Sequence, residues 1–287
     1  MTNGALPELT DELTVTAGQR TLDHPSAARR GWALTAPLNH RILRGEGGLL
    51  IVNWSLAFTS NPALEATVLA VASLLCLCGL YLFNDLVDAR EDLENPKKDH
   101  RLAELYVRER SLFLLLWFAI TTLAIALAGL IRATSAIAMV TVVAVNVAYS
   151  LRFKRLPVVD IVWVGLWGCA FGAIVSDSPA WLAMIGAMTA ACHIYQASED
   201  REVDRRHGLR TSATLPWAVL SAIQVALSLI LAGAAWHIVG DRIALTLLAF
   251  PFYWFFWRRS VRIAWIVAKV HFTIVWAWLI WQGGTIG

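Results

Sequence analysis

The run SLFLLLWFAITTLAIALAGLI, from Ser111 to Ile131, contains no charged residue. A stretch of about 18 or more mainly apolar residues can cross the hydrocarbon core of a membrane as a helix. Similar uncharged runs lie at 133–151, 178–198 and 211–240. The chain of 287 residues is 57% hydrophobic and 16% charged, whereas soluble domains carry about 25% charged residues. The sequence therefore predicts an all-α, polytopic membrane protein.

Membrane-spanning helices are predicted in these runs and in the shorter apolar segments between them. The nine predicted spans are 47–62, 63–83, 111–131, 133–151, 158–176, 179–198, 213–237, 242–257 and 261–281. The N-terminal residues are polar and lack the basic start and apolar core of a signal peptide. Residues 1–32 are predicted to be a disordered tail, with a helix beginning near Ala33. Residues 33–287 are predicted to form a single transmembrane domain.

Basic residues are distributed unevenly between the two sides that these spans define. The side with the N-terminus and the loops after spans two, four, six and eight holds 21 of the 24 Lys and Arg residues. Arg132, Arg242 and Lys269 are the exceptions. Cytoplasmic loops carry an excess of Lys and Arg, so this charged face is predicted to be cytoplasmic. We expect the protein to lie in the inner membrane of a bacterial cell.

A first acidic cluster, NDLVDARED at Asn84 to Asp92, directly follows the second predicted span. If that helix continues, Asp85, Asp88 and Asp92 share one face at spacings i, i+3 and i+7, with Asn84 beside them. Such oxygen ligands suit Mg²⁺, which takes a few carboxylates together with water and substrate phosphate oxygens. The alternative is a solvated helix end with ordinary acidic residues.

A second acidic cluster, SEDREVDRRHG at Ser198 to Gly208, follows the sixth predicted span. Asp200 and Asp204 are spaced i and i+4, and His193 and Gln196 lie upstream on nearly the same stripe. A polar stripe that enters the membrane usually faces a cavity, because facing lipid is costly; the alternative is a patch of interhelical hydrogen bonds. Closely packed carboxylates repel one another, so two clusters at one membrane face suggest Mg²⁺ ions that hold a diphosphate.

Basic and amide side chains near these clusters are candidates for substrate binding. Lys154 follows Tyr149 by five residues in YSLRFKR, at the end of the fourth span. Lys and Arg near Mg²⁺ can neutralise a diphosphate leaving group, although most of them can equally serve the membrane topology. The other candidates are Lys98, Arg101, Arg155, Arg205, Arg210 and the buried amides Asn53 and Asn146, for which helix bridging is the commoner role.

Taken together, these motifs resemble the UbiA-type superfamily of intramembrane prenyltransferases. The matching residues are N84-D85-x-x-D88-x-x-x-D92, then Y149-S150-x-x-x-K154 with Asp160, then D200-x-x-x-D204-x-x-x-G208-x-x-T211. The resemblance extends from about Ala36 to the C-terminus. It implies a helical bundle around a central cavity open to lipid. It also implies Mg²⁺-dependent transfer from a prenyl diphosphate to a lipophilic acceptor, commonly an aromatic ring.

The resemblance also implies roles by position. Asn84, Asp85, Asp88 and Asp92 hold one Mg²⁺-diphosphate contact, Asp200 and Asp204 hold the other, and Lys154 with Tyr149 contacts the donor. Asp88, Asp204, Lys154 and Tyr149 are therefore the predicted catalytic residues. The segment NPKKDHRLAEL departs from the family, because Leu102 stands where many members have proline and no glycine follows.

Three other functions remain open from the sequence. One is the branch of the same superfamily that transfers phosphoribose to a polyprenyl phosphate, which Asp160 favours. Another is an intramembrane terpene cyclase, which needs no external acceptor. A third is an ion-coupled transporter, which would place acids near the membrane midplane. The expected partners are the lipid bilayer and the substrates, with no nucleic acid and no obligatory protein partner.

Overall fold

The computed structural model describes residues 47–94, 100–199, 201–206, 210–256 and 260–286. Within these ranges all regular elements are helices, which confirms the all-α prediction. The α-helices are α2 (Gly48–Ser60), α3 (Ala63–Asp92), α4 (His100–Arg108), α5 (Arg110–Ile131), α6 (Ala133–Leu151), α7 (Val159–Gly172), α8 (Pro179–Glu199), α9 (Arg201–Arg206), α10 (Trp217–Val239), α11 (Phe250–Phe256) and α12 (Val261–Ile286). The 3-10 helices are η1 (Phe153–Arg155), η2 (Ser212–Thr214) and η3 (Arg242–Ala249). The predicted tail and the helix expected near Ala33 lie outside the described residues.

Five helices are long and apolar enough to cross a membrane: α3, α5, α6, α10 and α12. The segments Gly48–Ser60, Val159–Gly172 and Arg242–Phe255 are apolar but shorter. Every predicted span overlaps a helix of the structure, yet the count of nine membrane crossings stays a prediction. The eighth span is the least regular, because a 3-10 helix leads into α11 and Pro251 lies in the first turn of that helix, where a missing N–H is tolerated.

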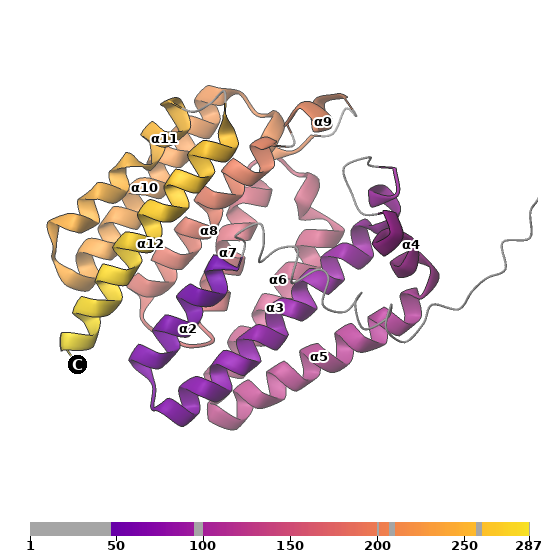
Figure 1. Cartoon of the computed structure of the whole chain (residues 1–287), viewed down its shortest axis with the longest axis horizontal. Coiled ribbons are helices and arrows are strands. Elements are labelled where there is room, and N and C mark those ends of the chain that lie inside the picture. Colours follow the sequence, from indigo (N-terminus) through magenta and orange to yellow (C-terminus); the bar gives the residue numbers. More distant parts are fainter. Residues whose placement is uncertain (1–46, 95–99, 200, 207–209, 257–259, 287) are drawn as a thin grey trace, which may run out of the picture.

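The helices pack as two neighbouring groups (Figure 1). In one group α3 contacts α2, α5 and α6, and in the other α8 contacts α10 and α12, while α7 lies against both α6 and α8. The α7–α8 contact is very close: a Cβ atom added to Gly186 would lie 2.2 Å from the Cys169 Sγ atom. Small residues allow such close approach of helices, and membrane bundles use them at their interfaces.

A small hydrophobic cluster holds the end of α3 in place. Leu82, Leu86 and Ala89 of α3 are buried against α4 and the start of α5. Tyr106 of α4 and Phe113 of α5 are 2% and 0% exposed, and their rings meet edge to face at 4.9 Å. This packing fixes the helix that carries the first acidic cluster.

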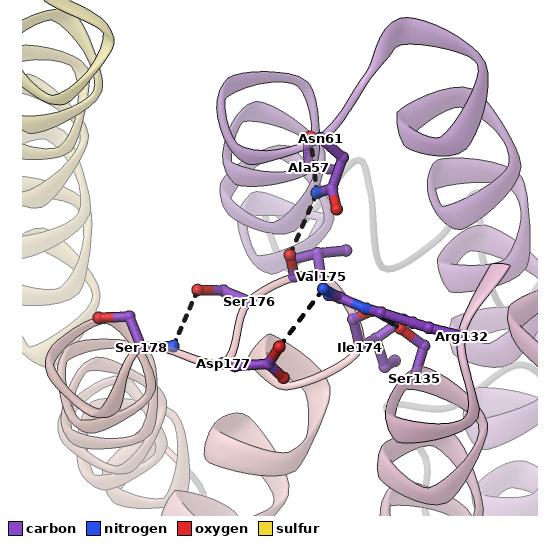
Figure 2. A network of polar contacts seen from close by, with 9 residues as sticks. All are labelled: Ala57, Asn61, Arg132, Ser135, Ile174, Val175, Ser176, Asp177 and Ser178. Carbon is purple, nitrogen blue, oxygen red and sulfur yellow. Dashed lines mark hydrogen bonds and ion pairs between the residues drawn. The ribbon is translucent and has the colours of Figure 1, made fainter. Parts of the chain in front are cut away.

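The turns between helices gather at two opposite ends of the bundle. At one end, the turns after α2, α5 and α7 meet in a polar network (Figure 2). There the Asn61 amide donates to the Val175 carbonyl at 3.2 Å, and Arg132 pairs with Asp177 at 3.4 Å. We call this the turn network; its members are Asn61, Arg132, Ser135, Ile174, Val175 and Asp177. The opposite end carries α4, η1, α9 and η2, and both acidic clusters lie there.

Candidate active site

The first acidic cluster lies on a continuous helix. α3 runs without a break to Asp92, so Asp85, Asp88 and Asp92 project from one helix at the spacing that places them on one face. The Asp88 carboxylate is 21% exposed, and its Oδ2 atom lies 2.5 Å from Lys154 Nζ on η1. The structure thus brings together two of the predicted catalytic residues, which are 66 residues apart in the chain.

The YSLRFKR segment is fastened to α3 by further polar contacts. Ser150 Oγ is hydrogen-bonded to Asn84 Oδ1 and lies 2.9 Å from the Asn146 carbonyl oxygen. The Asn146 amide donates to the Leu80 carbonyl at 3.2 Å. Arg155 pairs with Glu91, which lies about one turn beyond Asp88 on α3. These contacts hold the end of α6 and η1 beside the first acidic cluster.

A pocket opens between α3 and this segment. Its volume is about 150 Å³, and it is lined by Val87, Asp88, Glu91, Ser150, Leu151, Arg152, Lys154 and Arg155. Sites for whole small molecules usually measure about 300–1,000 Å³. The pocket is therefore of a size for a charged headgroup rather than for a complete lipophilic substrate. A central cavity open to lipid stays a prediction.

The second acidic cluster begins where α8 ends. Asp200, Gly208 and Lys98 fall outside the described residues, so their predicted roles are not placed. Asp204 lies on α9, and its Oδ2 atom accepts a hydrogen bond from the Thr211 hydroxyl at 2.6 Å. Arg205 and Arg210 are exposed beside it.

Arg201 joins α9 to α10. Its guanidinium carbon lies 4.3 Å from the centre of a ring of Trp217. Burial, and then the nearby Arg205, lower the pKa of Arg201.

Asp160 connects α7 to the segment after α9. Its carboxylate is 2% exposed and accepts from the Ile161 N–H at 2.7 Å, from the Ser212 N–H at 3.2 Å and from the Ser212 hydroxyl. Ser212 Oγ in turn accepts from the Val158 N–H at 2.8 Å. Val158 has a φ of 69°, a strained conformation for a β-branched residue. This network ties the 158–160 turn to residues 211–212, and hence to Asp204.

His193 of α8 faces the same network. Its Nε2 atom lies 3.6 Å from Asp160 Oδ2, and its ring is edge-on to Tyr149 of the YSLRFKR segment, with centroids 6.3 Å apart. A chain of contacts thus leads from Asp88 and Lys154 through Tyr149, His193 and Asp160 to Ser212, Thr211 and Asp204. Both acidic clusters lie at one end of the bundle and are joined through residues 149–160.

Three further predicted substrate-binding residues, Asn53, Arg101 and Gln196, lie at other positions on the helices. Asn53 donates to the Phe171 carbonyl at 2.8 Å, with its Oδ1 atom unpartnered. Phe171 lies roughly 16 Å along α7 from Asp160, so Asn53 bridges helices at a distance from the acidic clusters. Arg101 lies on α4 with an exposed side chain, and Gln196 lies one turn beyond His193 on α8. As substrate contacts, all three stay predictions.

Three residues that the structure brings into the network have no separate role in the sequence prediction. Ser150 contacts Asn84, Glu91 contacts Arg155, and Ser212 contacts Asp160. The signal available for Ser150 was its place within the YS motif, and Ser212 directly follows the matched Thr211. Their partners are 52 to 66 residues away in the chain. No local pattern indicates such contacts, because each one joins separate elements.

The donor set of the first cluster fits Mg²⁺. It offers carboxylate oxygens from Asp85, Asp88 and Asp92 and an amide oxygen from Asn84. Among the described residues, no three His, Cys, Asp or Glu side chains converge on one point. Mg²⁺ commonly uses one or two carboxylates and completes its shell with water and substrate phosphates, so a three-residue protein cage is not required.

A family model described as the UbiA prenyltransferase family matches residues 49–284. The chain belongs to this family. With its apolar helices, it is an integral membrane protein of the UbiA prenyltransferase family.

Curated relatives are about a quarter to a third identical to this UbiA-family chain over the aligned residues. The lycopene elongase/hydratase of Haloarcula japonica is 33% identical over 182 residues, which are 58% of this chain and 61% of that protein. The lycopene elongase/hydratase of Haloferax volcanii is 32% identical over 192 residues, 60% of each chain. The C(50) beta-cyclic carotenoids biosynthesis protein LbtBC of Dietzia sp. is 26% identical over 186 residues, 58% of this chain and 43% of that protein. The match thus spans about three fifths of the two lycopene elongase/hydratases.

Solved structures show the same fold. A UbiA homologue from Archaeoglobus fulgidus bound to DMAPP and Mg²⁺ superposes with a TM-score of 0.64 at 21% identity, covering 86% of this chain and 97% of that one. The structure of a UbiA homologue from the same organism bound to GPP and Mg²⁺ gives a TM-score of 0.64 at 18% identity, covering 88% and 99%.

Proposed function

We propose that this chain is a Mg²⁺-dependent intramembrane prenyltransferase that moves an isoprenyl group from a prenyl diphosphate to a lipophilic acceptor. The observation that carries the proposal is the pairing of Asp88 with Lys154 at a pocket of headgroup size, at the end of the bundle that also holds Asp204. The family of the chain and the donor set of α3 support it. The proposed orientation places this end at the cytoplasmic face, in keeping with its Lys and Arg content.

The chemistry requires stabilisation of a leaving diphosphate. The C–O bond of the donor breaks, its electron pair leaves with the diphosphate, and an allylic cation remains. Bound Mg²⁺ would neutralise charge that develops on the leaving oxygens. Asp85, Asp88 and Asn84 would hold one ion, and Asp204 with Asp200 the other. Lys154, which pairs with Asp88, is placed to turn its ammonium group to the diphosphate.

The chemistry alone does not select the acceptor, because any π-nucleophile can capture an allylic cation. The relatives named lycopene elongase/hydratase and the C(50) carotenoid protein support a long polyene hydrocarbon of the lycopene type. The solved homologues with DMAPP and GPP support a short allylic diphosphate as donor. We therefore propose prenylation of a carotenoid-like acceptor, narrower than the aromatic or lipophilic acceptor that the sequence predicts.

Product analysis by mass spectrometry tests the proposal. The purified full chain is incubated with Mg²⁺ and dimethylallyl, geranyl or phosphoribosyl diphosphate, with and without lycopene. We expect consumption of an allylic donor only when Mg²⁺ is present, and a product with the mass of acceptor plus prenyl group. Consumption of phosphoribosyl diphosphate would instead support phosphoribosyl transfer, and a cyclic hydrocarbon formed from the donor alone would support a cyclase.

Two variants test the site within the same assay. Asp88→Ala and Asp204→Ala should each abolish diphosphate release, because each removes a carboxylate from one acidic cluster. Full turnover by both variants would contradict the assignment of the site.

A further inference from the structure

A buried imidazole and a buried carboxylate face each other between the two acidic clusters. The His193 side chain is 14% exposed and that of Asp160 is 2% exposed, with 3.6 Å between Nε2 and Oδ2. His193 Nε2 is enclosed and has no hydrogen-bond partner. A buried polar atom without a partner is rare in proteins and calls for an explanation.

Three hydrogen bonds hold the Asp160 carboxylate in one orientation. Its two oxygens accept from the Ile161 N–H, the Ser212 N–H and the Ser212 hydroxyl. The carboxylate therefore presents its Oδ2 atom to the His193 ring in a fixed position. A carboxylate placed in this way orients an imidazole and stabilises the imidazolium that forms when the ring takes a proton.

The position of His193 connects it with the proposed reaction. Tyr149, whose ring meets the His193 ring, directly precedes Ser150, which binds Asn84, and lies in the segment whose Lys154 binds Asp88. His193 lies six residues before the end of α8 at Glu199, or about 9 Å below it along the helix. It is thus farther into the bundle than the charged groups, on the side where the hydrocarbon part of a donor would extend.

We propose that His193, oriented by Asp160, accepts the proton that prenyl transfer must release. This inference rests on the proposed function. When the π-electrons of the acceptor form the new C–C bond, a cation remains on the acceptor. It is discharged either by loss of a C–H proton, whose electron pair forms a double bond, or by capture of water, which then loses a proton. In both cases the proton goes to His193 Nδ1, because Nε2 is enclosed beside the Asp160 carboxylate, and Asp160 acts as the positioning residue.

The 3.6 Å separation is compatible with this role. Hydrogen bonds of catalytic groups are often long in ligand-free proteins and shorten when substrate binds. The alternative, a purely structural histidine, would leave Nε2 buried beside a carboxylate without a bond in every state of the protein. A structural role would affect folding but not the fate of the acceptor cation.

The test is the ratio of coupled product to released diphosphate, measured with Mg²⁺, dimethylallyl diphosphate and lycopene. A general base typically contributes about 100-fold or more to rate, so His193→Gln should lower coupled product by about 100-fold. Diphosphate release should fall less than about tenfold, since ionisation of the donor does not need this base. The allylic cations that are not coupled to the acceptor should be captured by water and released as prenyl alcohol. Asp160→Asn should move the ratio in the same direction by a smaller factor.

His237→Gln is the matched control, because His237 lies on α10 beside Ser178 at the opposite end of the bundle. It should keep the wild-type ratio. His193→Asn provides a second substitution in case His193→Gln does not fold, as judged by gel filtration in detergent. The product mass identifies the proton source, since a product that contains an added water shows that the proton came from water.

A folded His193 variant with the wild-type ratio, or with equal losses of product and diphosphate, would overturn the inference. A shift in Asp160→Asn without one in His193→Gln would also overturn it. Absence of diphosphate release by the wild-type protein with every allylic donor would instead contradict the proposed function itself.

Discussion

The two ends of the bundle both carry polar networks, but these networks differ in how far their contacts involve the main chain. In the turn network, Asn61, Arg132 and Ser135 donate mainly to main-chain carbonyls of Ile174 and Val175. At the acidic end, the described contacts of Asp88 and Asp204 join side chains, in the pairs Asp88–Lys154 and Asp204–Thr211. Bonds to the main chain fix a turn, whereas pairs of side chains can be rearranged by a ligand. The comparison indicates a structural role for one end and a binding role for the other.

Outside the two acidic clusters, the largest effect on activity is expected from Lys154→Gln. Removal of one group that stabilises charge in a transition state typically costs about 100-fold or more in rate. We expect diphosphate release to fall by about 100-fold, with the unfolding temperature unchanged because Lys154 is 43% exposed. Arg242→Gln, an exposed arginine at the start of η3, is the control. Equal losses of activity in Lys154→Gln and Arg242→Gln would contradict a binding role that is specific to the acidic end.

Ser212→Ala tests the connection between Asp160 and the second acidic cluster. Loss of the hydroxyl removes the acceptor of the Val158 N–H and one of the three donors to Asp160, and it loosens the segment in which Thr211 binds Asp204. We expect the Mg²⁺ concentration for half-maximal activity to rise about tenfold and stability to fall by about 1–2 kcal/mol. Ser228→Ala, which loses only a bond within α10, should leave the Mg²⁺ requirement unchanged. An unchanged Mg²⁺ requirement in Ser212→Ala would show that the contacts of Asp160 do not support the second acidic cluster.

Arg132→Ala should affect stability rather than activity. The Arg132 side chain binds Ser135 at 2.8 Å, the Ile174 carbonyl at 3.4 Å and Asp177 at 3.4 Å. Its loss should lower the free energy of unfolding by about 1–3 kcal/mol, measured by denaturation in detergent. Diphosphate release per folded molecule should stay at the wild-type level. A loss of activity without a loss of stability would assign a functional role to the turn network.

The smallest effect is expected from Asp177→Asn. Its carboxylate is 66% exposed, and exposed ion pairs contribute about 0–1 kcal/mol. The unfolding free energy should therefore change by less than about 1 kcal/mol, and less than in Arg132→Ala. A larger change would show that the turn network depends on charge rather than on bonds to the main chain.

Hydrophobic runs and spacing predicted much of this fold. The predicted span 133–151 coincides with α6, and the predicted continuation of the second span through the acidic residues is observed in α3 up to Asp92. α4 was not predicted as a helix, because its nine residues carry too few apolar side chains for a membrane span. Its buried residues Ala103, Leu105 and Tyr106 are recognisable only once α3 and α5 are in place.

The sequence indicated candidate residues for the site but not the contacts between them. Spacing indicated Asp88 and Lys154 separately, but their pairing depends on how α6 packs against α3. The network of Asp160 joins residues 52 positions apart, and no local pattern specifies such a contact. His193 was ambiguous in sequence, since a polar residue in a membrane helix suits both helix bridging and a binding site.

The most direct test of a functional acidic end compares one substitution at both ends. Diphosphate release from an allylic donor with Mg²⁺ is measured for Asp88→Asn and Asp177→Asn at equal amounts of folded protein. The proposed site predicts that Asp88→Asn loses nearly all activity and that Asp177→Asn retains the wild-type rate. Retained activity in Asp88→Asn, or equal losses in both proteins, would contradict it.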